Sequence, residues 1–235
     1  MDREFQEELL AHGTITVEGR ILASSNQALL VVLEGSGQSA RACYKAEAGE
    51  RPLWDFPEGL WRREVAAYEL DRLAGTDLVP TTVAREDGPF GPGSLQWWIE
   101  DALDEHYFTL RERPEFVSWF ARLAAFDFVA NNADRKAGHI LYDGTRLWAI
   151  DNGLCFHGED KLRTVIWDFA GEPLGEEVTA DVVRLLAGDA SRLAAMLGDE
   201  ELGYVLGRAQ RLLAAGHFPD PDPDGDYPPY PWPLI

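Results

Sequence analysis

The stretch that most constrains the fold is residues 126–156, FDFVANNADRKAGHILYDGTRLWAIDNGLCF. It begins as the end of an apolar helix and passes through a polar turn into two short apolar segments. These segments flank Asp143-Gly144, a strong signal for a β-hairpin, and the second delivers Asp151 at its end. A desolvated carboxylate persists only when a cation or a metal compensates it, so the stretch predicts a charged site. A hairpin with solvated acidic residues is the alternative.

The charge of the chain limits its partners. The formal net charge is −20 at pH 7, with 41 acidic and 21 basic residues among 235. Nucleic acids and anionic membranes are bound by clustered Lys and Arg, so we expect neither as a partner. No apolar run reaches the length of a membrane span, and the acidic start is unlike a signal peptide. We therefore expect a cytoplasmic protein whose two cysteines, Cys43 and Cys155, are reduced.

Lysine is used sparingly in this chain. Only three of the 21 basic residues are lysines, namely Lys45, Lys136 and Lys161. A lysine kept in an arginine-rich sequence indicates a place where a compact ammonium is needed instead of the broad guanidinium group. These three positions are therefore candidates for specific electrostatic roles.

The first part of the chain predicts an antiparallel sheet with one long helix. After a short helix at residues 3–12, apolar segments typical of strands follow at residues 14–23, 28–33, 39–44, 78–83 and 94–99. The third of these ends in Lys45. Residues 60–73 have the periodicity of an amphipathic helix that carries Glu64. Facing Lys45, Glu64 would orient the ammonium by an ion pair; a solvated glutamate is the ordinary alternative.

The second part of the chain is mainly helical. Helices are expected at residues 114–131, 178–187, 189–197 and 199–215. The last 17 residues hold seven prolines and four aspartates, which favours an extended polyproline II conformation. Because this tail also carries aromatic residues, we expect it to pack on the larger lobe, with a disordered tail as the alternative.

In this order, the strand-end lysine, the helix glutamate, residues 134–136 and residues 151–153 resemble the protein-kinase-like fold in its atypical branch. That branch includes the phosphatidylinositol 3/4-kinases, the HipA-type toxin kinases and the atypical secretory-pathway kinases. The chain is similar to a short bacterial member of the phosphatidylinositol 3/4-kinase-like family. The resemblance implies a two-lobed α+β fold. Its small antiparallel-sheet N-lobe would cover residues 1–99, its mainly helical C-lobe residues 100–218, and the tail residues 219–235.

The same resemblance implies ATP and Mg²⁺ or Mn²⁺ as cofactors and assigns roles to residues. Lys45 would pair with the α- and β-phosphates and be held by Glu64. Asp134 would accept the proton of the attacking hydroxyl, and Lys136 would neutralise the γ-phosphate. Asp151 would hold the metal ion that bridges the phosphates.

Some positions depart from the family pattern. His139 stands where a metal-binding asparagine is expected; a neutral imidazole can bind a metal, and a packed core histidine is the alternative. A small polar turn of Ser24, Ser25 and Asn26 stands in place of the glycine-rich nucleotide-binding loop, although an ordinary surface turn has the same composition. Asn152 replaces the phenylalanine that commonly follows the metal-binding aspartate.

These features predict an ATP- and metal-dependent phosphotransferase acting on a hydroxyl group of a protein or a small molecule. A lipid acceptor fits the acidic charge poorly, because anionic bilayers attract basic surfaces. Two alternatives stay open. One is a catalytically silent, nucleotide-binding pseudokinase that serves as a scaffold or regulator, and the other is an enzyme that transfers AMP on the same fold.

Overall fold

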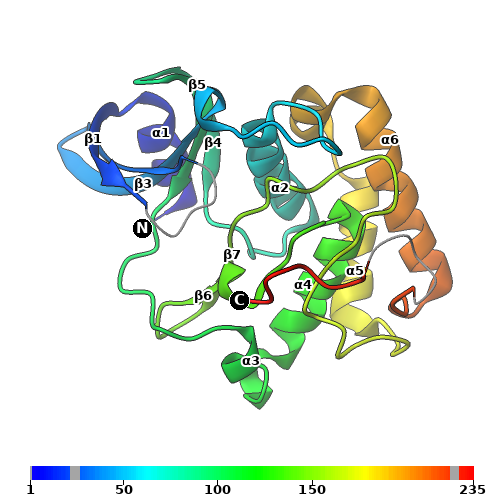
Figure 1. Cartoon of the computed structure of the whole chain (residues 1–235). Helices are drawn as coiled ribbons and strands as arrows, with labels where there is room; N and C mark the ends of the chain where they lie inside the picture. The colour runs from blue at the N-terminus through cyan, green and yellow to red at the C-terminus, as the bar shows by residue number, and fades with distance from the viewer. Residues whose placement is uncertain (1, 22–26, 223–227) are drawn as a thin grey trace.

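A computed structural model describes residues 2–21, 27–222 and 228–235. Its first half contains a five-stranded antiparallel sheet in the order β1-β2-β3-β5-β4 (Figure 1). The strands are β1 Thr14–Arg20, β2 Leu29–Gly35, β3 Gln38–Ala46, β4 Thr82–Gly88 and β5 Gly91–Trp97. Helix α1, Arg3–His12, packs on one face of the sheet through Leu9 and Leu10. The expected α+β class is confirmed.

Strand β3 lies in the middle of the sheet and separates two environments. Tyr44 and Ala46 are buried in the core that the sheet forms with α1. Because successive side chains of a strand point to opposite faces, Lys45 between them points away from this core. The register places Lys45 opposite Ser94 of β5. The lysine that the sequence singles out is thus held on a strand with neighbours on both sides.

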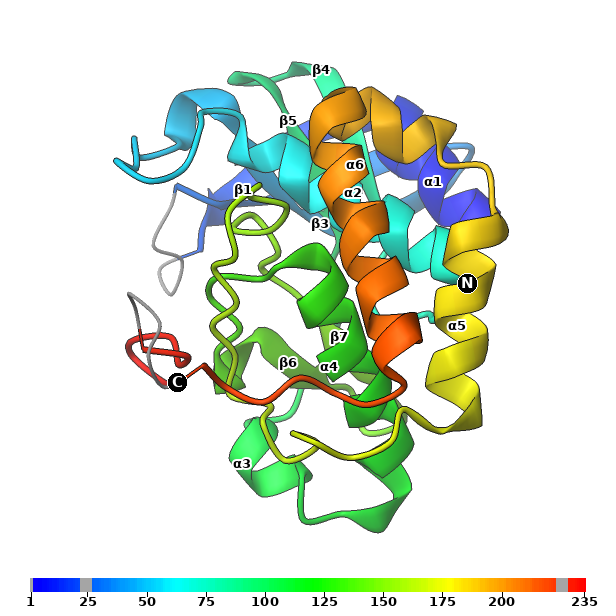
Figure 2. The ribbon, with the colours of Figure 1, turned by 90° about the vertical axis from the view of Figure 1, so that its right-hand side faces the viewer.

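The second half of the chain is built around helices. Helix α2, Leu60–Ala74, joins the sheet to α4, Val117–Ala130, α5, Gly175–Ala187, and α6, Ser191–Ala215. Figure 2 shows α5 and α6 next to one another on the outside of this group. Shorter elements complete the fold: α3 Tyr107–Leu110 and the 3₁₀ turns η1 Glu47–Gly49, η2 Pro114–Phe116 and η3 Ala137–His139.

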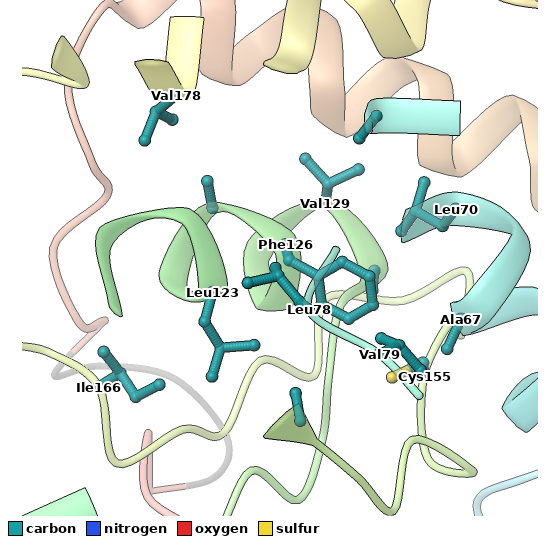
Figure 3. Close-up of a cluster of buried hydrophobic side chains, with 14 of the residues drawn as sticks. Ala67, Leu70, Leu78, Val79, Leu123, Phe126, Val129, Cys155, Ile166 and Val178 are labelled. Carbon is teal, nitrogen blue, oxygen red and sulfur yellow. The ribbon is translucent and has the colours of Figure 1, made fainter. Parts of the chain in front are cut away.

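Apolar side chains from α2, α4 and α5 meet in one core (Figure 3). Leu70 of α2, Phe126 and Val129 of α4, and Val178 of α5 are all buried there. Burial of each such side chain contributes about 1.5–3 kcal/mol. This core fixes the end of α4, from which the polar turn of residues 131–139 leaves.

The predicted hairpin is present as β6, Ile140–Tyr142, and β7, Leu147–Ala149. Asp143 begins the turn, and its Oδ1 accepts hydrogen bonds of 2.8 Å from the backbone N–H groups of Thr145 and Arg146. Asp143 is therefore a turn residue, while the second strand leads directly to Asp151 as expected.

One expected strand has the wrong bounds. The strand predicted over residues 78–83 starts only at Thr82, and β4 continues past the predicted end to Gly88. Leu78 and Val79 belong to the helical core, so their apolar character reflects packing and not strand pairing. The two helices expected at residues 189–197 and 199–215 are present as the two parts of α6, which meet at Gly198, where the backbone is not helical (φ +78°). None of the described helices combines the length and apolar character needed to cross a membrane.

The described part of the C-terminal tail bonds to the helical part of the chain, as expected (red in Figure 1), but through its backbone and not through its aromatic residues, since Tyr230 and Trp232 are exposed. The carbonyl of Pro229 accepts hydrogen bonds of 3.1 Å from the Thr164 N–H and from Trp167 Nε1. The carbonyl of Leu234 accepts one of 2.8 Å from the N–H of Ala137, three residues after Asp134. The tail thus supports the same turn that carries the predicted catalytic residues.

Deletion of residues 219–235 is expected to lower the free energy of unfolding by about 2–4 kcal/mol, since three hydrogen bonds of roughly 1 kcal/mol each are lost together with apolar contacts. Urea denaturation followed by tryptophan fluorescence measures this change. Trp232→Ala is the control, because this side chain is 87% exposed and should leave stability unchanged. An unaltered unfolding midpoint after the deletion would show that the tail contributes nothing to stability.

Candidate active site

An ion-pair cluster joins β3, α2 and the segment after β7. The ammonium of Lys45 bonds to Glu64 Oε1, and its Nζ lies 2.7 Å from Asp151 Oδ1. Glu64 Oε2 accepts a 3.0 Å hydrogen bond from the N–H of Asn152, which fixes the carboxylate from the other side. The predicted pairing of Lys45 with Glu64 is therefore present. Asp151 is a second carboxylate partner of Lys45 in this cluster.

The charges in this cluster support one another. Burial disfavours the protonated form of Lys45, but Asp151 and Glu64 more than offset this effect and raise the pKa of Lys45. Lys45 in turn lowers the pKa of Asp151, although partial desolvation of the carboxyl group opposes this shift. Lysine and aspartate are both charged at neutral pH. The ammonium of Lys45 therefore lies beside the carboxylate of Asp151, whose side chain is 43% exposed.

The backbone at Asp151 is turned to present its carboxylate. This residue has a φ of +57°, in the left-handed region that non-glycine residues seldom adopt. Just before it, the N–H of Ile150 donates a 2.9 Å hydrogen bond to the carbonyl of His139, so the hairpin holds both sides of the site.

His139 lies against the same carboxylate. Its Nε2 is 3.3 Å from Asp151 Oδ2, and its Nδ1 accepts a 3.4 Å hydrogen bond from the N–H of Lys136. Burial lowers the pKa of His139 to about 4, although Asp151 opposes this shift. The imidazole is neutral at pH 7, which is the form that binds metals.

Asp134 faces the cleft from the turn after α4. Its Oδ2 lies 2.8 Å from Lys136 Nζ, and its N–H donates a 3.0 Å hydrogen bond to the side chain of Asn132. Burial raises the pKa of Asp134, and Lys136 counteracts part of that shift. Lys45, Glu64, Asp134 and Asp151 all line one cleft of about 240 Å³.

The predicted site residues are thus largely brought together. Lys136 contacts Asp134, and His139 contacts Asp151, at the edge of the cleft. The predicted anion-binding turn of Ser24, Ser25 and Asn26 lies outside the described residues. The cleft is smaller than the about 300–1,000 Å³ of typical small-molecule sites, so a whole nucleotide requires it to widen.

A buried ion pair that the sequence analysis missed supports this arrangement. Asp127 on α4 and Arg135 are both fully buried, and Arg135 Nε lies 3.1 Å from both carboxylate oxygens of Asp127. Arg135 also donates to the carbonyl of Ile150 at 2.8 Å and to Asn152 Oδ1 at 2.6 Å. Asn132 Nδ2 donates to Asp127 Oδ1 at 3.0 Å. One guanidinium therefore links the turn of Asp134 to the loop of Asp151.

A sequence signal for this pair exists. Asp127 stands between Phe126 and Phe128 in an otherwise apolar helix. A charged residue at a core position requires a partner, since an isolated buried charge costs several kcal/mol, on the order of 3–5. Which residue supplies the partner depends on the tertiary fold.

The residues present fit a divalent metal bound together with phosphates. Among the described residues, no group of three or more His, Cys, Asp and Glu side chains has the arrangement of a complete metal site. Asp151 and His139 offer one oxygen and one nitrogen donor side by side. Mg²⁺ is commonly held by one or two carboxylates, with substrate phosphates and water completing its shell. The arrangement suits a metal that arrives with a nucleotide.

The sequence has known relatives. A family described as phosphatidylinositol 3- and 4-kinase matches residues 63–200, which include Glu64, Asp134 and Asp151. Protein Rv2133c of Mycobacterium tuberculosis is 38% identical over 273 aligned positions, which cover 99% of this chain and 96% of that protein.

The structure resembles solved atypical kinases. Hydra Fam20 shares 13% identity and a TM-score of 0.52 over 88% of this chain and 86% of that one. The Helicobacter pylori proinflammatory kinase CtkA shares 10% identity and a TM-score of 0.54 over 89% and 94%. The Golgi casein kinase shares 11% identity and a TM-score of 0.54 over 91% and 76%. At such low identity the likeness shows the fold alone, and that fold is kinase-like, as expected.

Proposed function

Because this chain belongs to the phosphatidylinositol 3- and 4-kinase family, we propose that it is an ATP- and divalent-metal-dependent kinase that phosphorylates a hydroxyl group of a protein or a small molecule. The observation that carries the proposal is the convergence of Lys45, Asp134 and Asp151 in one cleft. We assign residues 1–99 to the N-lobe, residues 100–218 to the C-lobe and residues 219–235 to the tail.

Lys45 is the phosphate-binding group in this proposal. Glu64 keeps the ammonium in place from the side of α2. When a nucleotide binds, Lys45 exchanges its contact with Asp151 for phosphate oxygens, and Asp151 becomes available with His139 to hold the metal. Mg²⁺ or Mn²⁺ would neutralise phosphate charge there. The 2.7 Å contact of Lys45 and Asp151 thus keeps each charge compensated before the ligands arrive.

Asp134 is the proposed base. Its carboxylate lines the cleft and holds the Lys136 ammonium 2.8 Å away. An acceptor hydroxyl that approaches Asp134 can pass its proton to the carboxylate while its oxygen attacks the γ-phosphorus of ATP; the bond from that phosphorus to the β–γ bridging oxygen breaks, and ADP leaves. Lys136 then lies next to the charge that moves onto the transferred phosphate, where an ammonium stabilises it.

Addition of ATP with Mg²⁺ or Mn²⁺ is expected to raise the melting temperature, because ligand at a hundred times its dissociation constant adds about 2.7 kcal/mol of stability. Metal alone should have little effect, since within the described part of the chain Asp151 and His139 give it two protein donors. Differential scanning fluorimetry measures both shifts.

Lys45→Met is the matched variant for this experiment. It removes the proposed phosphate contact, so the shift with ATP and metal should largely disappear. If neither ATP, GTP nor a non-hydrolysable analogue shifts the melting of the unaltered protein with either metal, the kinase proposal fails.

A further inference from the structure

A second cavity, of about 1180 Å³, adjoins the connection between β3 and α2. Glu50, Arg51 and Leu53 of this connection line the cleft of the candidate active site, whereas residues 54–57 line the second cavity. The other walls come from His157 and residues 159–163, from described residues of the C-terminal tail, and from Phe128, Asn131, Trp167 and Arg208. The connection is therefore shared between the candidate active site and this second cavity.

The floor of the cavity is tied to the start of the catalytic turn. Asn131 Nδ2 donates to the carbonyls of His157 and Glu159, at 2.9 and 2.6 Å, and Asn131 Oδ1 accepts a 2.8 Å bond from the N–H of Lys161. The N–H of Arg163 donates to the carbonyl of Asn132 at 2.9 Å. Residues 157–163 are thus fixed to the two residues that stand just before Ala133 and Asp134.

The charged side chains of residues 159–161, which line the cavity, differ in their exposure to solvent. Glu159 and Asp160 have side chains that are each 80% exposed. Lys161, by contrast, is only 7% exposed, and its Nζ lies 3.4 Å from Asp55 Oδ2. Lys161 is therefore recessed, while the two carboxylates face solvent and form only long ion pairs, Glu159 with Lys161 at 3.8 Å and Asp160 with the exposed Arg211 at 3.5 Å.

One inner wall offers an unused donor. Arg208 lines the cavity and is 2% exposed, and its guanidinium donates to the carbonyls of Val129 and His157. Its Nη2 has no hydrogen-bond partner within the described part of the chain. A buried donor of this kind is costly unless a ligand carbonyl or water satisfies it.

The rim carries an aromatic side chain that faces solvent. Trp54 is 83% exposed, and its ring lies 5.9 Å from Lys161 Nζ. Exposed Trp at the edge of a cavity is typical of binding surfaces. The face of an indole ring attracts ammonium and guanidinium groups, so Trp54 and the carboxylates of Glu159 and Asp160 favour the same kind of partner.

We propose that the second cavity binds the acceptor and that this acceptor is a polypeptide segment with basic side chains near its hydroxyl residue. The inference rests on the proposed kinase function. The volume exceeds the about 300–1,000 Å³ of typical small-molecule sites, so an extended chain fills it better than a metabolite does. The net charge of −20 would draw a basic polypeptide toward the protein and repel anionic lipid surfaces.

Binding and transfer to three matched peptides test the proposal. Each peptide contains a single serine, flanked by arginine, by glutamate or by glutamine. Fluorescence anisotropy with a non-hydrolysable ATP analogue and Mg²⁺ gives affinities, and label from γ-labelled ATP gives transfer. Phosphatidylinositol vesicles serve as the lipid arm. The arginine peptide is expected to bind about tenfold more tightly than the glutamate peptide at low salt, and to accept label.

Charge reversal on the rim sharpens the experiment. A variant with Glu159→Lys and Asp160→Lys is expected to weaken binding of the arginine peptide by about five- to tenfold and to strengthen that of the glutamate peptide. Trp54→Ala should cost about two- to fivefold in the affinity for the arginine peptide. The control combines Glu34→Lys with Glu86→Lys, which change the net charge equally at exposed positions of β2 and β4.

The possible results separate the two proposals. Equal binding of all three peptides, a rim variant that behaves like the control, or label on the vesicles and not on the peptides would overturn the basic-polypeptide acceptor. In each of those cases the kinase function stands if ATP and metal still raise the melting temperature. Without that shift and without transfer to any acceptor, the kinase function itself fails.

Discussion

Asp134→Asn is expected to reduce phosphoryl transfer by about 10²–10⁴-fold, the usual contribution of a positioned general base. Nucleotide affinity should stay close to that of the unaltered protein, since Asp134 contacts Lys136 and not the Lys45–Asp151 pair. Label transfer and isothermal titration calorimetry measure the two effects. Asp104→Asn is the control, because Asp104 is exposed and lies outside the residues that line the cleft.

Asp151→Asn is expected to act at the earlier step. The substitution removes the negative charge that offsets the cation, so metal-dependent nucleotide binding should be lost. It also removes a partner of Lys45, whose ammonium keeps only Glu64. Equal loss of nucleotide affinity in both variants, with folding preserved, would falsify the assignment of Asp134 as the base.

The same measurements distinguish the alternative functions. A pseudokinase would bind nucleotide in an Asp151-dependent way, yet it would show no transfer for Asp134→Asn to remove. An enzyme that transfers AMP would pass on label from the α-position of ATP and none from the γ-position. Neither result depends on knowing the natural acceptor.

The sequence predicts most of the pairings near the cleft because they follow from local signals. Asp143-Gly144 between apolar segments specifies the hairpin, and the hairpin places Asp151. The scarcity of lysine indicates Lys45, and the helix periodicity places Glu64 where the two can meet. Each of these signals depends on only a few neighbouring residues, and the structure contains the hairpin and the ion pair that they predict.

Other features depend on contacts between distant segments and could not be predicted. The apolar residues Leu78 and Val79 resemble the start of a strand in the sequence, but in the structure they pack in the helical core. The Asp127–Arg135 pair requires α4 and the turn after it to fold back on each other. The second cavity is lined by several segments that are far apart in sequence. The local sequence of each segment indicates that it is apolar or charged, but it does not indicate which distant segment will contact it.

The Asp127–Arg135 pair provides the largest expected effect on stability. Asp127→Asn keeps the shape of the side chain but leaves the fully buried guanidinium of Arg135 without its counter-charge. Breaking one side of a buried pair costs about 3–5 kcal/mol. Glu105→Gln is the control: it breaks the pair with Arg113, whose side chain is 36% exposed, and such a pair contributes only about 0–1 kcal/mol. Urea denaturation compares the two losses, and equal losses would contradict this assignment.

A double variant separates the stability of this pair from its role in the site. Asp127→Leu combined with Arg135→Met removes both charges, and replacement of a buried ion pair by apolar residues is often close to neutral. Its stability should therefore exceed that of Asp127→Asn. Transfer should nevertheless stay low, because Arg135 no longer bonds to the carbonyl of Ile150 and to Asn152, which hold the loop of Asp151. A double variant with full activity would show that the two loops keep their positions without the guanidinium. A stable but inactive protein would show that the guanidinium positions Asp134 relative to Asp151.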